Sequence, residues 1–246
     1  MFARNEAIAR RQSGFGYQIC LVLMVLIYIS TSPAKAQHTD TTFISRKKTK
    51  DYYWAIYIEK NRQSKKYKNL LDFKMNKWDA KNYKESLDSL KKRKIIKIKA
   101  LAGLPKEWLP LYLYKGKYYI YYPCEWDNGD RRILTDSTLV DPSMEGPIPR
   151  PLQTVKKINA NTYYLQLKAF YSIGPPISTL IIHIIDAKNN IAVWEDTSQQ
   201  GPYRYGLYVA KQSAANFDMV VNYCDNNRVP EFEFDKIDYT ALLKGH

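Results

Sequence analysis

Hydrophobic and polar residues alternate along most of the chain, with the period of two that β-strands with one buried face require. From residue 106 onward such runs follow one another, separated by turn-forming groups such as Lys115-Gly116 and Lys188-Asn189-Asn190. The pattern predicts strands at 111–122, 132–134, 138–140, 162–168, 179–186, 191–195, 203–210, 217–222 and 231–237. The short connections favour antiparallel hairpins over crossover helices.

This spacing predicts a mainly β fold: a single antiparallel meander that closes into a barrel or forms a two-sheet sandwich, with one N-terminal surface helix. The closed alternative is lipocalin-like by architectural analogy only, because the G-x-W signature of a lipocalin's first strand is absent. Fold analogy of this kind carries no function.

The region 51–105 predicts a strand, a helix and a second strand that belong to the same fold as the β domain at 106–246. Aromatic and β-branched residues alternate over 51–59, and 61–69 is charged, as expected of a loop or a frayed helix. Tyr83, Leu87 and Leu90 recur at helical spacing in 78–92, and Asp79 is the predicted N-cap. The period returns to two over 94–100, which predicts a short strand.

Two strands and one loop carry further expectations. The almost continuous apolar run at 180–185 predicts a strand buried on both faces. The segment 142–151 holds four prolines and is expected to be an extended loop, because proline cannot donate to a sheet. In 231–237, acidic residues alternate with Phe232 and Phe234, which predicts a wet face and a buried face.

Residues 1–36 have the three-part layout of a secretory signal peptide. Arg4, Arg10 and Arg11 precede an apolar run at 19–29, and small residues at Ala34 and Ala36 predict cleavage between Ala36 and Gln37. The run is too short to span a membrane, which takes about 20 apolar residues. We therefore expect an exported protein, periplasmic or extracellular and bacterial in type, with no transmembrane segment after cleavage. A flexible basic leader at 37–50 follows the cleavage site.

Cys124 and Cys224 are the cysteines that remain after cleavage, so only one intramolecular pairing is possible. In an oxidising compartment they are candidates for a disulfide, and the alternative is two buried thiols.

The chain carries a formal net charge of +14, with basic clusters at 46–50, 65–68 and 91–94. Export argues against nucleic acid as the partner. The clusters are then solvated faces, or they bind an anionic surface or acidic glycans.

Sequence motifs for phosphate loops, nucleophile elbows and zinc sites do not occur, so neither a metal nor a cofactor is predicted. His183 is interpreted as a core histidine whose ring bonds a neighbouring group, against the alternative of a nucleophile–base dyad. Glu231, Glu233 and Asp235 lie on one face of the last predicted strand, at a spacing compatible with a glycosidase acid pair. A solvated face is the simpler interpretation of this ladder.

The densest aromatic stretch is 111–126, LYLYKGKYYIYYPCEW. A two-residue loop at Lys115-Gly116 predicts a hairpin with two distinct faces. One face is a core face: Leu111, Leu113, Tyr118, Ile120 and Tyr122. The other, which we call the tyrosine face, comprises Tyr112, Tyr114, Lys117, Tyr119 and Tyr121. It is the predicted binding face, because tyrosine combines an apolar ring with a polar tip. It could line a cavity, present a stacking platform or pack under the helix.

Three functional hypotheses follow. The first is an exported, non-enzymatic β protein that binds a small ligand, a glycan or an anionic surface through the tyrosine face. The second is a secreted glycosidase-like hydrolase that uses carboxylates of the last strand. The third is a structural protein of the cell envelope, held by its positive charge.

Overall fold

The structure is a computed structural model that describes residues 41–124, 131–142, 146–169, 176–225, 229 and 231–244. Residues 40–246 form one compact unit, and the fold below is that of this unit. The predicted signal peptide, its cleavage site at Ala36 and Gln37, and the terminal histidines His38 and His246 lie outside the described residues.

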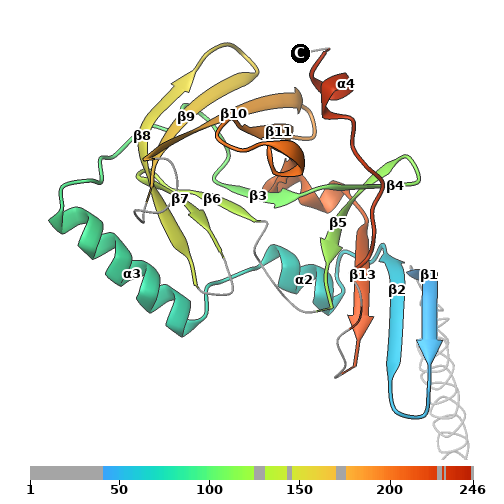
Figure 1. Ribbon diagram of the computed structural model, residues 1–246. Helices are drawn as coiled ribbons and strands as arrows, with labels where there is room; N and C mark the ends of the chain where they lie inside the picture. The colour runs from blue at the N-terminus through green and yellow to red at the C-terminus, as the bar shows by residue number, and fades with distance from the viewer. Residues whose placement is uncertain are drawn as a thin grey trace, which may run out of the picture. The chain divides into compact units, whose positions relative to one another are not determined.

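A closed antiparallel barrel is the larger part of the described structure, in the order β10-β11-β12-β3-β6-β7-β8-β9 (Figure 1). Its strands are β3 (Glu107–Pro110), β6 (Arg132–Leu134), β7 (Thr138–Asp141), β8 (Ile148–Lys157), β9 (Thr162–Lys168), β10 (Ile177–Asp186), β11 (Ile191–Asp196) and β12 (Tyr205–Ala210). The strands β6 to β12 form a meander, and β3 closes it by pairing with both β12 and β6. The barrel alternative is therefore confirmed.

The period-two pattern fills the barrel interior. In β9, Tyr163, Leu165 and Leu167 are buried, while the residues between them are half-buried. They pack with Trp108 and Trp194, whose rings meet edge to face at 5.7 Å. Alternation thus places one face of each strand in the interior, where apolar burial stabilises the fold.

A second, mixed sheet has the order β1-β2-β13-β5-β4. Its strands are β1 (Thr41–Lys48), β2 (Tyr53–Glu59), β4 (Tyr112–Tyr114), β5 (Lys117–Tyr122) and β13 (Met219–Cys224). The pair β13 and β5 is parallel, and the other pairs are antiparallel. The hairpin β4–β5 thus leaves the barrel path between β3 and β6 and joins a different sheet.

A second apolar cluster joins this sheet to the outer face of the barrel. Val193 and Leu207 from the barrel pack in one cluster with Ile120 and Val221 from the sheet. The strand buried on both faces is therefore β11, whose residues 191–195 are all buried. The neighbouring β10, for which the sequence predicted this, is only half-buried at Ile181 and His183 on its outer side.

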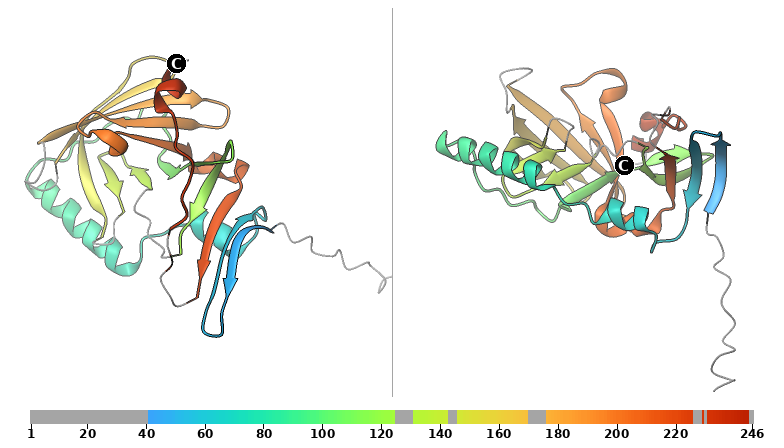
Figure 2. Two further views of the ribbon diagram at one scale, coloured as in Figure 1. Left: turned by 45° about the vertical axis from the view of Figure 1, so that its right-hand side comes forward. Right: turned by 90° about the horizontal axis from the view of Figure 1, so that it is seen from below.

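Three α-helices are described: α2 (Lys65–Leu71), α3 (Lys77–Lys92) and α4 (Tyr239–Leu243). The predicted surface helix is α3, which lies outside the barrel beside β7 and β8 (Figure 2) and bonds Thr138 Oγ1 through Tyr83 Oη at 3.1 Å. The predicted N-cap is wrong by three residues: Asn76 caps the helix, and its side chain accepts from the backbone N–H of Asp79 at 2.8 Å.

Several other predictions are wrong. The expected flexible leader contains β1, and its charged residues lie on an edge strand that pairs with β2. The segment 94–100 forms no strand. The short strand β3 was missed. The expected final strand at 231–237 is reduced to a single bridge between Leu113 and Asp235.

The proline-rich segment also differs from expectation, because Pro149 and Pro151 belong to β8. They stand opposite Val140 and Thr138 of β7. Hydrogen-bonded and non-hydrogen-bonded pairs alternate along an antiparallel ladder, and Leu152 N–H donates to Ser137 O at 2.8 Å, so both prolines occupy non-hydrogen-bonded positions. Pairing with β9 begins only at Leu152, so no donor is missed on that side.

Candidate functional site

The tyrosine hairpin has the predicted register. Tyr112 faces Tyr119, Leu113 faces Tyr118 and Tyr114 faces Lys117 across a two-residue loop. Both loop residues, Lys115 and Gly116, have the positive φ that a type I′ turn requires, 49° and 74°. Two core-face residues, Leu111 and Ile120, are buried in the cluster between sheet and barrel.

The tyrosine face is covered by the protein's own C-terminal segment. Residues 231–237, here called the C-terminal strap, run past β4 and β5 between β13 and α4 (Figure 1). Phe232 and Phe234 of the strap pack against the tyrosine face. The Tyr112 ring stacks on Phe234 at 4.5 Å, and the Tyr114 and Phe232 rings meet edge to face at 5.1 Å. Lys117 is exposed at the end of this face. The setting under the predicted helix is wrong, because that helix, α3, contacts β8 and bonds Thr138, and the C-terminal strap lies against the tyrosine face instead.

Two of the three candidate carboxylates hold the strap in place. Tyr121 Oη donates to Glu231, and the backbone N–H of Lys115 donates to Asp235 Oδ2 at 2.6 Å. Burial, and then the bonded Glu231 carboxylate, raises the pKa of Tyr121 well above its ordinary value. Glu233 is exposed. Glu231 and Asp235 therefore fasten the strap to the hairpin.

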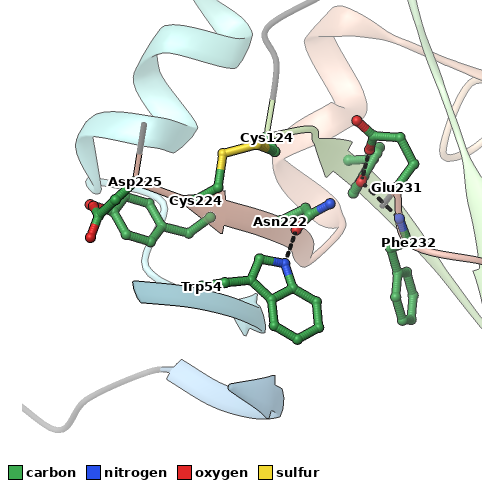
Figure 3. Close-up of a disulfide and its surroundings, with 9 residues drawn as sticks. Trp54, Cys124, Asn222, Cys224, Asp225, Glu231 and Phe232 are labelled. Carbon is green, nitrogen blue, oxygen red and sulfur yellow. Dashed lines mark hydrogen bonds between the residues drawn. A yellow bond between two sulfur atoms is a disulfide. The ribbon is translucent and has the colours of Figure 1, made fainter. Parts of the chain in front are cut away.

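Cys124 and Cys224 form a disulfide just after β5 and at the end of β13 (Figure 3), with Cα atoms 5.5 Å apart. Beside them, Trp54 Nε1–H donates to Asn222 Oδ1 at 2.9 Å, which links β2 to β13. Each sulfur is occupied by the other, so neither cysteine is a nucleophile here.

His183 bonds a neighbouring carboxylate, as predicted, but it is half-buried on the outer side of β10 and does not belong to the core. Its Nε2 lies 3.4 Å from Glu195 Oε2, and Arg204 donates to the other oxygen from Nε at 3.0 Å and from Nη2 at 2.6 Å. Burial alone would raise the pKa of Glu195, but the bonds and charges of Arg204 and His183 outweigh it and lower that pKa. The group is an ion-pair cluster on the outer barrel surface.

A cavity lined by described residues lies at one mouth of the barrel and has a volume of about 440 Å³. We call it the mouth pocket. Its charged and aromatic lining is formed around six residues: Arg132, Asp141, Arg150, Trp194, Gly206 and Tyr208. Each comes from a barrel strand and from the face that points inward. Below them the interior is filled by Leu134, Leu139 and Leu152, so the pocket ends on a packed apolar floor.

The strand pattern explains this change from apolar to polar. Arg132, Asp141 and Arg150 lie two positions from Leu134, Leu139 and Leu152, on the same face of the same strands. Near the end of each strand the inward position is therefore charged. This is the signal that sequence reasoning missed, because adjacent strands must be placed before such ends can be seen to converge.

One carboxylate serves two guanidinium groups in the pocket. Arg132 Nη1 pairs with Asp141 Oδ1, and Arg150 Nε lies 2.9 Å from Asp141 Oδ2. The second pair lacks hydrogen-bond alignment, so the buried Arg150 Nε–H has no hydrogen-bond partner among the described residues. Together the three groups carry one positive charge.

The aromatic wall depends on Gly206. A Cβ on this residue would lie 2.6 Å from the Tyr208 ring, closer than real contacts allow. Glycine lets the ring lie across the strand, where it meets Trp194 at a centroid distance of 5.5 Å. The Trp194 Nε1–H is buried and also has no partner among the residues that the structure describes.

In the described ranges, no three His, Cys, Asp or Glu side chains gather closely enough to hold a metal ion. No helix in these ranges combines the length and the apolar character needed to cross a membrane. Comparison of the chain with family models, curated proteins and solved structures finds no match, so geometry alone carries the functional argument.

Proposed function

We propose that this is an exported, non-enzymatic binding protein that holds a small ligand in the mouth pocket. The observation that carries the proposal is the division of the barrel interior into a packed apolar floor and an open polar mouth of about 440 Å³. Pockets of about 300–1,000 Å³ with aromatic walls and a few converging polar groups are typical small-molecule sites.

The mouth pocket replaces the tyrosine face as the preferred binding site. Tyr112, Tyr114 and Tyr121 already contact Phe232 and Phe234, so a ligand would have to displace the strap to reach their rings. A ligand at the barrel mouth needs no such rearrangement.

Export belongs to the proposal and rests on the layout of residues 1–36. If it is right, the N-terminal peptide of the protein recovered outside the producing cell's cytoplasm, identified by mass spectrometry, begins at Gln37. Recovery of an intact N-terminus would contradict it.

Binding can be tested by a thermal-shift screen against a broad metabolite library, with two matched variants. Ile148→Trp fills the pocket from its lining, whereas Ile158→Trp makes the same change at an exposed position just beyond β8. We expect at least one ligand that stabilises the native protein and Ile158→Trp but not Ile148→Trp. The proposal fails if no compound stabilises the native protein, or if Ile148→Trp responds equally.

A further inference from the structure

We infer that helix α3 and the segment after it dock the protein on an anionic lipid bilayer. The docking surface, here called the basic ridge, consists of eight exposed residues: Lys77, Lys81, Lys84, Lys91, Lys92, Arg93, Lys94 and Lys97. All eight lie within the described ranges and none lines the mouth pocket, so this surface is independent of the function proposed above. Its charge, its geometry and its exposed apolar neighbours support a bilayer as the partner.

The basic ridge has more cations than acidic partners. Residues 77–97 contain eight basic and three acidic residues, so their formal charge is +5. Lys81 pairs with Glu85 at 3.9 Å and Lys91 with Asp88 at 3.8 Å, and such long, exposed pairs contribute little. The other six ridge residues form no ion pair with any described residue. An anionic surface supplies the missing countercharge, and each basic residue beside such a membrane surface strengthens binding about fivefold.

The packing of α3 turns these cations away from the barrel. Tyr83 bonds the barrel strand β7, and Leu90 is buried. Lys77, Lys81 and Lys84 recur at spacings of four and three, which keeps their side chains together on one side of a helix. The 16 residues of α3 span about 24 Å on the outside of the barrel (Figure 2). A straight row of cations of this length can meet a flat anionic surface along its whole extent.

Exposed apolar side chains accompany the ridge at both ends. Trp78, in the first turn of α3, is 57% exposed, and Ile98, beside Lys97, is 80% exposed. Cations next to exposed tryptophan and large aliphatic residues are typical of segments at a bilayer interface, where the cations meet headgroups and the apolar groups enter the acyl boundary. A soluble acidic polymer offers the same countercharge but no apolar phase. The combination therefore favours lipid.

Vesicle flotation of the purified protein tests the inference. The probes are vesicles of phosphatidylcholine alone and vesicles of phosphatidylcholine mixed with phosphatidylglycerol. We expect binding that rises with the phosphatidylglycerol content and falls as salt is added, because added ions screen exposed charges. Equal binding to both kinds of vesicle, or binding to neither, overturns the inference.

Two matched triple variants locate the surface. The ridge variant replaces three exposed lysines that form no ion pair with any described residue: Lys84→Gln, Lys92→Gln and Lys97→Gln. The control variant makes the same change at three exposed lysines in β1 and just after it: Lys47→Gln, Lys48→Gln and Lys50→Gln. Because all six positions are exposed, thermal unfolding of both variants should match that of native protein.

The two triple variants should differ in vesicle binding. We expect the ridge variant to bind the mixed vesicles at least tenfold more weakly than native protein, and the control variant to stay within threefold of it. An equal loss in both variants overturns the inference, because net charge and not the ridge would then drive binding.

Ile98→Ser separates a bilayer from a soluble polyanion. We expect this variant to bind the mixed vesicles several-fold more weakly, whereas Ile158→Ser, at another exposed position, binds like native protein. Alginate, a soluble acidic polysaccharide, is the competing probe. The bilayer is refuted as the partner if Ile98→Ser binds vesicles like native protein, or if alginate binds through the ridge and the mixed vesicles do not bind. Either result leaves ligand binding in the mouth pocket intact, and failure of the ligand screen leaves the ridge intact.

Discussion

The tyrosine face and the mouth pocket are two aromatic surfaces that differ in what lies against them. The tyrosine face is conspicuous in the sequence, yet Phe232 and Phe234 cover it. The residues of the mouth pocket are dispersed over strands from β6 to β12, yet the described residues leave a cavity of about 440 Å³ between them. A strand rich in aromatic residues can simply be a surface on which other parts of the protein pack. A small-molecule site instead needs polar and aromatic side chains from several strands that converge around a cavity.

Removing the disulfide is expected to separate the two regions most strongly. Replacing Cys124 and Cys224 with serine opens a loop of 100 residues, which in the chain-entropy model lowers the free energy of unfolding by about 4.7 kcal/mol. Guanidinium denaturation of native and double-variant protein measures this. Because the disulfide lies in the second sheet, ligand affinity at the barrel mouth should not change at denaturant concentrations that leave the protein folded. A decrease of less than about 1 kcal/mol in the free energy of unfolding would contradict a stabilising role for the disulfide.

Phe234→Ala tests whether the tyrosine face is a packing surface. Full truncation of a core phenylalanine costs about 3–5 kcal/mol, and this half-buried side chain should cost about 2 kcal/mol. Urea denaturation gives the value. Tyr203→Ala, at the exposed rim of the pocket, is the matched aromatic truncation and should alter stability by less than about 0.5 kcal/mol while weakening ligand binding. If Tyr203→Ala lowered the stability and Phe234→Ala weakened ligand binding instead, the tyrosine face would be the binding surface and the pocket rim the packing surface.

Tyr121→Phe sharpens the comparison with a smaller change. It removes the hydroxyl that donates to Glu231 and accepts from the backbone N–H of Phe232. We expect a loss of about 1 kcal/mol in the free energy of unfolding, measured by denaturation at neutral pH. Tyr203→Phe is the control, and an equal effect in both variants would show that the strap bond adds nothing.

The smallest expected effect concerns pH and the ion-pair cluster next to the mouth. The pKa of Glu195 is lowered in the folded protein, so its ionised form stabilises the fold above the unfolded pKa of about 4.5. That contribution is lost as the pH falls through the lower folded value. Thermal unfolding between about pH 6 and pH 3 should show a shallower acid-side decline for Glu195→Gln than for native protein, with Glu233→Gln as the exposed control. Parallel curves for all three would count against the cluster.

Local patterns predicted much of the fold. The limits of β6 and β9 agree with expectation at 132–134 and 162–168, since short alternating runs end at clear turn residues. Helix α3 was found to within one residue because its apolar spacing is regular. The strands β1 and β8 were missed, because charge and proline argue against a strand unless its place at an edge or in the ladder is known.

Local sequence patterns could not predict the mouth pocket. The sequence contains the alternation that turns Arg132, Asp141 and Arg150 inward, and it contains the loop that sets the register of the tyrosine hairpin. Tertiary structure alone decided that the strap covers that hairpin and that three strand ends converge on one open mouth. The physical reason is that alternation is a property of a single strand, whereas burial, convergence and charge balance depend on neighbours far apart in the chain.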